Sequence, residues 1–508
     1  MGTPPLNRPL RVAAVATLLL CARAGGAPAQ GYHLRLDTRI QSVSVRGWAL
    51  DSIAVSDTVS TPGGGPTSPE GYAVRCFAGA SYCSFFRPGP DRRSQPLTTT
   101  ADLTLWGLGV AGLSVHVLGR LGADVGGADH WPGTSPAVQL FEGYAQYATR
   151  RATVRLGRQM VASRLGTTGF DGAGVVLRDR RWGLDVQGYL GWGLARGSAL
   201  PVTSAAVNPL NDFQPVARQI VAGAGAGWRS NGADARIEYQ REVDPRTDKF
   251  VSERLALQGS VRPSARVSVT AGADYDVVFG WWGSAEAALA YADRRVRAQL
   301  GLRRYRPHFD LWTIWGAFSP IAYRAADASV AVVAHRRITV RGRYEGYQFD
   351  EAEAATPLFQ GAERDGWRWE LGGTLTPASG WTVDGVYRAE YGPGAASAGF
   401  AGHVAYAPSR RLSIAVQGSS VKRPLEYRFN EAVVRTVGVD AEFEASTAVR
   451  LGVSAIRYDE SHRRPDAAAY DWDQLRLAAR VVLQLGRGAD LRGLPPSIGM
   501  LPGGRAER

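Results

Sequence analysis

Long hydrophobic runs are missing from this sequence of 508 residues once the first thirty residues have been passed. A membrane-spanning helix needs about 20 consecutive, mostly apolar residues, so a bundle of such helices is excluded. Cysteine is also scarce, with 3 in the chain, and no C-x-x-C-H motif for covalent haem attachment occurs. Hydrophobic residues make up only 45% of the chain, whereas glycine is abundant with 61 residues. This balance suits strands that have one apolar and one polar face.

Catalytic and nucleotide-binding motifs are absent as well. The 7 histidines are scattered, and none has a serine or aspartate partner at a diagnostic spacing, although partners on separated strands escape such a search. The glycine-rich stretch Gly223–Gly227 lies inside a strand pattern and is not followed by a helix, unlike a nucleotide-binding fingerprint. We therefore predict that the protein is not an enzyme and needs no cofactor.

The first thirty residues read as an export signal. Arg8 and Arg11 form a positive region, residues 12–21 form a short apolar core, and Ala27-Pro28-Ala29 fits a signal-peptidase site. Residues 1–29 are thus predicted to be a cleaved signal peptide. A lipoprotein signal at Cys21 is the alternative, but the residues directly before it are leucines and not the small residues that such a signal needs.

Export bears on the two remaining cysteines, Cys76 and Cys83, which lie in the stretch RCFAGASYC. In an oxidising compartment such a pair predicts a disulfide that pins a loop. A metal site is disfavoured because no histidine or further cysteine stands at ligand spacing.

A net charge of +13 could indicate binding to nucleic acid. The arginines are instead spread over alternating segments and short turns, without a basic helix or an aromatic RNA-binding motif. We predict no nucleic-acid partner.

The clearest pattern lies in residues 366–392. Apolar and polar residues alternate from Trp367 to Leu375 and again from Trp381 to Tyr387, on either side of the turn-forming Pro377-Ala378-Ser379-Gly380. This pattern predicts an antiparallel hairpin. Each arm has about 10 residues, the length at which a tilted strand crosses a bilayer, and aromatic residues stand near the ends.

The same pattern repeats along the chain and predicts about 22 strands, within a range of roughly 18 to 24. Every second connection is tight, and Asn231-Gly232 is the strongest turn signal among them. The predicted fold is all-β: a transmembrane antiparallel up-and-down β-barrel over residues 30–485, with short periplasmic turns and longer extracellular loops. The longest loops are expected at about residues 51–98 and 194–216, and a disordered tail at residues 486–508.

The chain resembles the Gram-negative outer-membrane β-barrels and is porin-like in organisation. The features that carry the resemblance are the export signal, the alternation of apolar and polar residues, the length of the strands, and short connections on one side with long ones on the other. The resemblance covers nearly the whole mature chain. It implies residence in the cell outer membrane, contact with lipid and lipopolysaccharide, and insertion by the barrel-assembly machinery. One feature departs from that pattern: such barrels usually end on a strand with a terminal aromatic residue, whereas this chain ends at Arg508.

With apolar residues facing lipid, the inward face of the strands is heavily charged. The charges expected to line the lumen are Arg120, Arg155, Arg236, Arg297, Arg303, Arg341, Arg343, Arg368, Glu370, Asp384, Arg388, Arg476 and Arg480. Arg368 and Glu370 are in register to pair with Asp384 and Arg388 across the turn. One arginine conflicts with the pattern, because Arg158 falls on the apolar face of its strand, which an interfacial position or a bulge would explain.

These charges either hold the wall together or select solutes, with the arginine excess favouring anions. A barrel of about 22 strands is wide, so its lumen has to be narrowed by loops or filled by a partner. We expect a porin-like channel for passive diffusion of small hydrophilic solutes, anionic ones among them, narrowed by the loops at residues 51–98 and 194–216. The alternatives are a sheath around a partner multihaem cytochrome in an outer-membrane electron conduit, which requires a periplasmic or lumenal partner protein, and a structural surface barrel.

Overall fold

A computed structural model describes residues 31–60, 66–126, 137–194, 219–245, 249–306, 322–350, 364–392, 395–422, 432–462 and 471–487. The predicted signal peptide and C-terminal tail therefore lie outside the described residues, apart from the last two residues of the final strand. Within the described part, no helix is long and apolar enough to cross a membrane.

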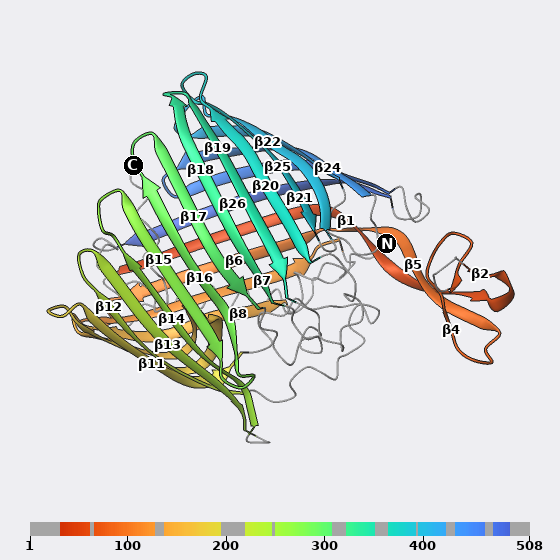
Figure 1. The fold of residues 1–508 in the computed structure, drawn as a ribbon. Helices are drawn as coiled ribbons and strands as arrows, with labels where there is room; N and C mark the ends of the chain where they lie inside the picture. Colours follow the sequence, from red (N-terminus) through yellow and green to blue (C-terminus); the bar gives the residue numbers. More distant parts are fainter. Residues whose placement is uncertain are drawn as a thin grey trace, which may run out of the picture.

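The chain forms a closed antiparallel barrel of 22 strands. Each strand pairs with the next along the chain, and β1 closes the ring by pairing with both β6 and β26 (Figure 1). The barrel strands are β1 (Gly31–Ala54), β6 (Pro96–Trp106), β7 (Leu113–Asp124), β8 (Val138–Ala148), β9 (Ala152–Ser163), β10 (Gly166–Asp179), β11 (Leu184–Gly193), β12 (Ile220–Arg229), β13 (Ala233–Asp244), β14 (Lys249–Val261), β15 (Val267–Asp276), β16 (Trp281–Ala292), β17 (Val296–Tyr305), β18 (Tyr323–His335), β19 (Ile338–Phe349), β20 (Asp365–Leu375), β21 (Trp381–Gly392), β22 (Ala395–Tyr406), β23 (Leu412–Lys422), β24 (Ala432–Ser446), β25 (Val449–His462) and β26 (Trp472–Arg487).

The two faces of the wall have opposite chemistry. On β9, the outward side chains of Val154 and Leu156 are 37% and 59% exposed, whereas the inward Thr153 and Arg155 are buried. This arrangement is the reverse of a water-soluble fold, in which apolar side chains are buried in the core. An apolar exterior around closed backbone ladders suits a lipid surrounding, in which every backbone polar group needs a partner within the protein.

The connections are short throughout one end of the barrel, whereas the other end has both long connections and short ones, such as those between β9 and β10 and between β15 and β16. At the end where β1 begins and β26 ends, the turns are short, such as Asn231-Gly232 between β12 and β13. In the turn between β16 and β17, hydrogen bonds from the backbone N–H groups of Val296 and Arg295 lower the pKa of the Asp293 carboxyl. The longer connections lie at the opposite end, which is extracellular if the barrel has the usual orientation.

Residues 51–98 differ from the expected irregular loop. Strand β1 continues to Ala54 and pairs with β5 (Tyr82–Ser94), and the ladder runs from the pair Val43–Ser94 to the pair Ala54–Tyr82. We call the two-stranded ribbon of residues 43–54 and 82–94, with the residues between them, the arm. The arm projects beyond the rim of the barrel (Figure 1), so it does not narrow the lumen as predicted. Apart from Leu194, the second expected loop at 194–216 lies outside the described residues.

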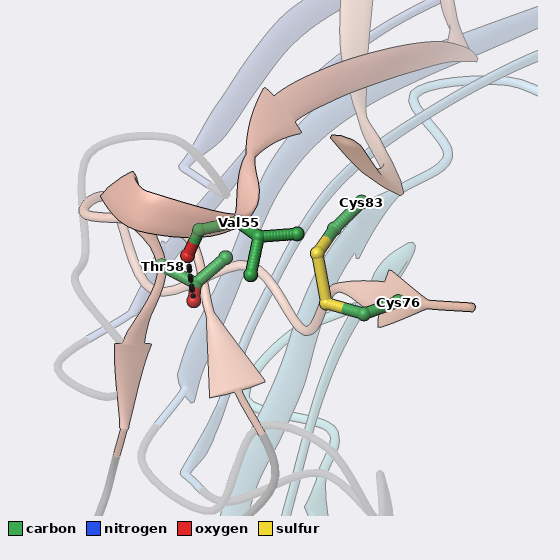
Figure 2. Close-up of a disulfide and its surroundings, with 4 residues drawn as sticks. All are labelled: Val55, Thr58, Cys76 and Cys83. Atoms are coloured by element: carbon green, nitrogen blue, oxygen red, sulfur yellow. Dashed lines mark hydrogen bonds between the residues drawn. A yellow bond between two sulfur atoms is a disulfide. The ribbon is translucent and has the colours of Figure 1, made fainter. Parts of the chain in front are cut away.

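The tip of the arm is a small folded unit. It contains the 3-10 turn η1 (Val55–Asp57) and the short strands β2 (Val59–Ser60), β3 (Pro66–Thr67) and β4 (Arg75–Cys76). Cys76 and Cys83 form a disulfide with a Cα–Cα distance of 4.3 Å (Figure 2). The bond ties β4 to β5 at a position where only two residue pairs hold these strands together.

Replacing Cys76 and Cys83 together by serine is expected to loosen the tip of the arm and to leave the barrel folded. The reason is that the disulfide lies outside the closed ladders of the barrel. Limited proteolysis followed by mass spectrometry measures the effect, and cleavage between residues 66 and 82 should increase. Two free thiols in the non-reduced, purified wild-type protein would contradict the bond itself.

Candidate functional site in the barrel lumen

The hairpin of β9 and β10 leaves the barrel wall and bends into the lumen. Its ladder with β8 ends at the pair Gly143–Arg158, although β9 continues to Ser163. The bend occurs at Gly157, whose φ of 124° lies in a region that L-residues with side chains rarely adopt. A Cβ atom at this position would also lie 2.4 Å from the carbonyl oxygen of Gly143. Glycine is therefore required at the bend.

The bend explains why Arg158 stands on the apolar face. Its guanidinium forms two hydrogen bonds with the Asp171 carboxylate, at 2.7 and 2.9 Å, so neither charge faces lipid alone. Its Nη1 also donates to the carbonyl oxygen of Leu140, at 3.0 Å, on the stretch of β8 that β9 has left. The arginine thus supplies a donor to a strand edge where the neighbouring strand is missing.

Arg164, in the turn between β9 and β10, reaches across the lumen to the wall formed by β13 and β16. Its Nη1 is 2.7 Å from Glu286 Oε1, and its Nη2 donates to Ser284 Oγ at 2.8 Å. Its backbone N–H donates to Glu238 Oε2 at 3.0 Å. The Arg164 side chain is only 12% exposed. We call these contacts the lumen bridge.

Apolar side chains on β9, β10 and β11 pack together beside the lumen bridge. Phe170 and Val161, both buried, face the lumen on the bent hairpin, and Phe170 stacks on Tyr189 with ring centroids 5.1 Å apart. Tyr189 needs the space left by a glycine of the GAGAG stretch, because a Cβ atom on Gly223 would lie 2.1 Å from Tyr189 Cζ. This stretch therefore has a packing role, and this side of the lumen is filled by side chains.

A second wall of the lumen, formed by β17 to β21, carries a network of charges. Glu345 is fully buried and binds three guanidinium groups: Arg368 at 2.6 Å, Arg343 at 3.3 Å, and Arg303. The two arginines nearest to Glu345 are Arg303 on β17 and Arg368 on β20, whereas Glu345 itself is on β19. Three cations around one buried carboxylate leave positive charge on this part of the lumen surface, offset in part by Asp327, which lies 3.9 Å from Arg343.

The other predicted lumen charges fall into similar local pairs. Arg341 forms two hydrogen bonds with Asp384, at 2.7 and 2.8 Å, and Thr374 donates to the same carboxylate. Arg236 binds Glu238 and Asp185, and Arg480 binds Asp37 on the closing strand β1. Arg120 and Arg155 donate to Gln139 and Gln146.

The remaining predicted charges are placed by register. Glu370 lies between Arg343 and Arg388 in one row across three strands. The pairing of Glu370 with Arg388 is the one that the sequence predicts. Arg297 lies in the row of Arg341, and Arg476 lies on the inner face of β26. The expected contact between Arg368 and Asp384 is not formed. Arg368 faces Glu390 in the register, because the turn sets Asp384 opposite Thr374.

One histidine has partners that the sequence search did not find. His116 on β7 lies 3.0 Å from Thr104 Oγ1 through Nδ1 and 3.2 Å from Glu142 Oε2 through Nε2. Its ring packs on Tyr144, with centroids 5.1 Å apart. His116 and its partners come from three neighbouring strands, so no spacing in the sequence could have revealed the group. The contacts fix the imidazole against the lumen wall.

These observations decide the fold. The ladders close on themselves, the exterior is apolar, and the interior is lined with paired charges. The chain has the fold of the Gram-negative outer-membrane β-barrels. Within this fold, a hairpin of the barrel wall bridges the lumen and the first strand continues into an arm.

Comparison with solved structures finds outer-membrane barrels. The ferric enterobactin receptor PfeA from Pseudomonas aeruginosa matches with a TM-score of 0.49 and 10% identity, over 90% of this chain and 81% of that chain. A BenF-like porin from Pseudomonas fluorescens Pf-5 matches with 0.39 and 11%, over 89% and 99%. OccK3 from Pseudomonas aeruginosa matches with 0.36 and 11%, over 89% and 96%. At such scores the assignment of the fold rests on the strand pairing of this outer-membrane barrel itself.

No protein-family model matches the chain, and none of the curated proteins matches it.

Proposed function

We propose that the protein is an outer-membrane channel for the passive diffusion of small hydrophilic solutes, with a preference for anions. The observation that carries the proposal is the division of the lumen. One side is filled by the bent hairpin and its apolar support, whereas the wall of β17 to β21 presents partly exposed arginines. The Arg343 and Arg368 side chains are 52% and 42% exposed. Charged side chains that line a pore in this way select the ions that pass.

Of the two loops expected to narrow the pore, the one at 51–98 forms the arm, which points away from the barrel, and in this proposal the turn at Arg164 narrows the lumen in its place. The other expected loop, at 194–216, lies outside the described residues apart from Leu194. The cytochrome-sheath alternative needs a lumen that is open to a partner protein, and the lumen bridge occupies part of that space. A purely structural surface barrel remains the alternative that the next experiment tests. We further propose that residues 1–29 are removed on export and that the barrel-assembly machinery inserts the chain beside lipopolysaccharide.

The purified protein, refolded into a planar lipid bilayer, is expected to give steady open-channel steps. In a salt gradient the reversal potential should show an anion preference, since the exposed charges of the β17–β21 wall are largely arginines. Replacing Arg343 and Arg388 by glutamine should shift that potential toward zero or toward cation preference. Replacing Arg304, a 58% exposed arginine of β17 on the outer face, by glutamine is the matched control and should not shift it.

A bilayer that stays silent with correctly folded protein would favour the structural barrel. Cation preference in the wild-type protein would contradict the selectivity but not the channel.

A further inference from the structure

The wall of the barrel is interrupted between β8 and β9. The ladder that joins these strands runs from the pair Ala148–Thr153 to the pair Gly143–Arg158 and then stops, although β8 begins at Val138 and β9 continues to Ser163. Among the described residues, β7 is the only strand that pairs with residues 138–142 of β8. One edge of this stretch therefore lacks a neighbouring strand.

A side chain takes the place of backbone pairing at this edge. The carbonyl oxygen of Leu140 accepts a hydrogen bond from Arg158 Nη1 at 3.0 Å, and Arg158 also forms an ion pair with Asp171. In a continuous sheet, neighbouring strands lie about 4.8 Å apart and bond through their backbones. Because an arginine side chain makes the contact from β9 to Leu140, the two strands have moved apart at this point.

The interruption lies at the depth of the membrane. Val138 and Leu140 are 61% and 45% exposed, as lipid-facing side chains of the wall are. They belong to the half of β8 nearer the long connections, which faces the outer leaflet in the usual orientation. Backbone without a strand partner is tolerated at this depth only where it is buried in protein or borders a water-filled space. Since this stretch is exposed, we expect water of the lumen to reach it.

The apolar outer face of β9 continues past the interruption into the barrel. Before the bend at Gly157, Val154 and Leu156 are exposed on the outer face. The ladder with β10 keeps one register through the bend, so Met160 and Ala162 stand on the same face of the hairpin. Both are exposed as well. Apolar side chains therefore form a continuous track from the lipid to the lumen.

The other face of the bent hairpin is packed against the wall. Phe170 is buried and stacks on Tyr189 of β11, with ring centroids 5.1 Å apart. Thr168, on the same face, donates to Gln240 Oε1 of β13 at 2.9 Å. The face that carries Met160 is thus left to border the space between the hairpin and the edge of β8.

We propose that the interruption between residues 138–142 of β8 and 158–163 of β9 is a lateral port, through which single-chain amphiphiles pass between the lumen and the outer leaflet. An alkyl chain follows Leu156, Met160 and Ala162 from the lipid into the barrel, whereas the polar head group stays in the water of the lumen. A track on the face of one strand accommodates one chain, which favours single-chain amphiphiles over phospholipids. The port goes beyond the proposed channel, because solutes of the channel do not enter lipid.

A nitroxide spin label on a cysteine that replaces Met160 tests the port. Cys76 and Cys83 form a disulfide, so the new thiol is labelled specifically. In lipid vesicles, the label should respond both to oxygen, which concentrates in lipid, and to a water-soluble nickel chelate, which enters the lumen. Val154→Cys on the outer face should respond to oxygen alone, and Ser419→Cys on the inner face of β23 to the nickel chelate alone. A response of position 160 to only one of the two reagents overturns the port.

Transport is measured with a fluorescent dodecyl sulfonate and vesicles that contain the full-length protein. Serum albumin extracts the amphiphile that remains outside. The protein should raise the rate of internalisation severalfold over that of empty vesicles. Gly157→Val should return the rate toward that of empty vesicles, because valine does not adopt the φ of 124° at the bend and β9 then straightens along the edge of β8. Gly342→Val is the matched control and should transport as the wild type does, since a Cβ atom there meets no atom closer than 3.8 Å.

Ion conductance separates the two proposed routes. In Gly157→Val the conductance should rise while amphiphile transport falls, because the hairpin leaves the lumen, and this opposite change shows that the variant is folded. Undiminished amphiphile transport in that variant, or a wild-type rate equal to that of empty vesicles, overturns the port. If Gly157→Val does not fold, the label at position 160 decides, because it keeps the native bend. Amphiphile transport without ion conductance would leave the port standing and remove the channel.

Discussion

Replacing Arg164 by alanine together with Leu165 by serine is expected to raise the single-channel conductance severalfold. The double change removes the ion pair to Glu286 and the bond to Ser284, and it replaces the buried Leu165 by a polar residue. The turn then loses its side-chain bonds to β16 and keeps the bonds to β13 that the backbone N–H of residue 164 makes with Glu238 and that Thr168 makes with Gln240. Current through the lumen should rise because a side-chain obstruction becomes mobile. Planar-bilayer recording at a fixed salt concentration measures it.

Arg181→Ala is the matched control, since Arg181 is an exposed arginine in the short turn between β10 and β11. It should leave the conductance unchanged. Unchanged conductance in the Arg164 and Leu165 variant, with the barrel folded, would mean that solutes do not pass this hairpin. The proposed path would then be wrong, whatever the ion selectivity.

Replacing Glu345 by glutamine is expected to lower the free energy of unfolding by about 3 kcal/mol. Breaking a buried ion pair from one side costs 3–5 kcal/mol, and the low end applies because the arginines reach water. Glu345 is fully buried, and its loss leaves Arg303, Arg343 and Arg368 close together without their common carboxylate. Urea unfolding in lipid vesicles, followed by tryptophan fluorescence, measures the change.

The control is Glu370→Gln on the adjacent strand, which faces the same lumen but is not fully buried. It should cost well under half as much. Adding Arg303→Gln to Glu345→Gln should recover part of the loss, because one of the repelling cations is removed. A double variant no more stable than Glu345→Gln alone would contradict the electrostatic explanation.

The wall of the barrel could be predicted from the sequence because each strand carries its own signal. Alternation of Val154 and Leu156 with Thr153 and Arg155 is a local pattern, and the structure places the first pair outward and the second inward. Short turns such as Asn231-Gly232 are local signals too. A closed barrel then follows, since unpaired edges are not tolerated in lipid.

The contents of the lumen could not be predicted in the same way. Arg164 meets Glu286 across 122 residues of sequence, and the bend that brings them together depends on the backbone at Gly157. A single glycine within an alternating strand is compatible with a straight strand. His116 and its partners Thr104 and Glu142 likewise come together only when three strands are in register.

The arm was missed for a different reason. Residues 51–98 are rich in glycine, proline and serine, and this composition masked the ribbon that β1 and β5 form. β5 contains Pro88, Gly89 and Pro90, and the ribbon is irregular at the adjoining positions of β1. Arg158, in contrast, was marked as a conflict by the sequence, and the structure shows that it binds Asp171 and the exposed edge of β8.

The continuity of β1 has a mechanical consequence. The same strand forms one side of the arm and both closing ladders of the barrel, and the ladder with β26 runs from the pair Tyr32–Arg487 to the pair Ser42–Leu477. A pull on the tip of the arm along the axis of β1 loads all these backbone hydrogen bonds together, in shear, and does not open them one after another. Tension applied to the arm is therefore shared by both ladders that close the barrel.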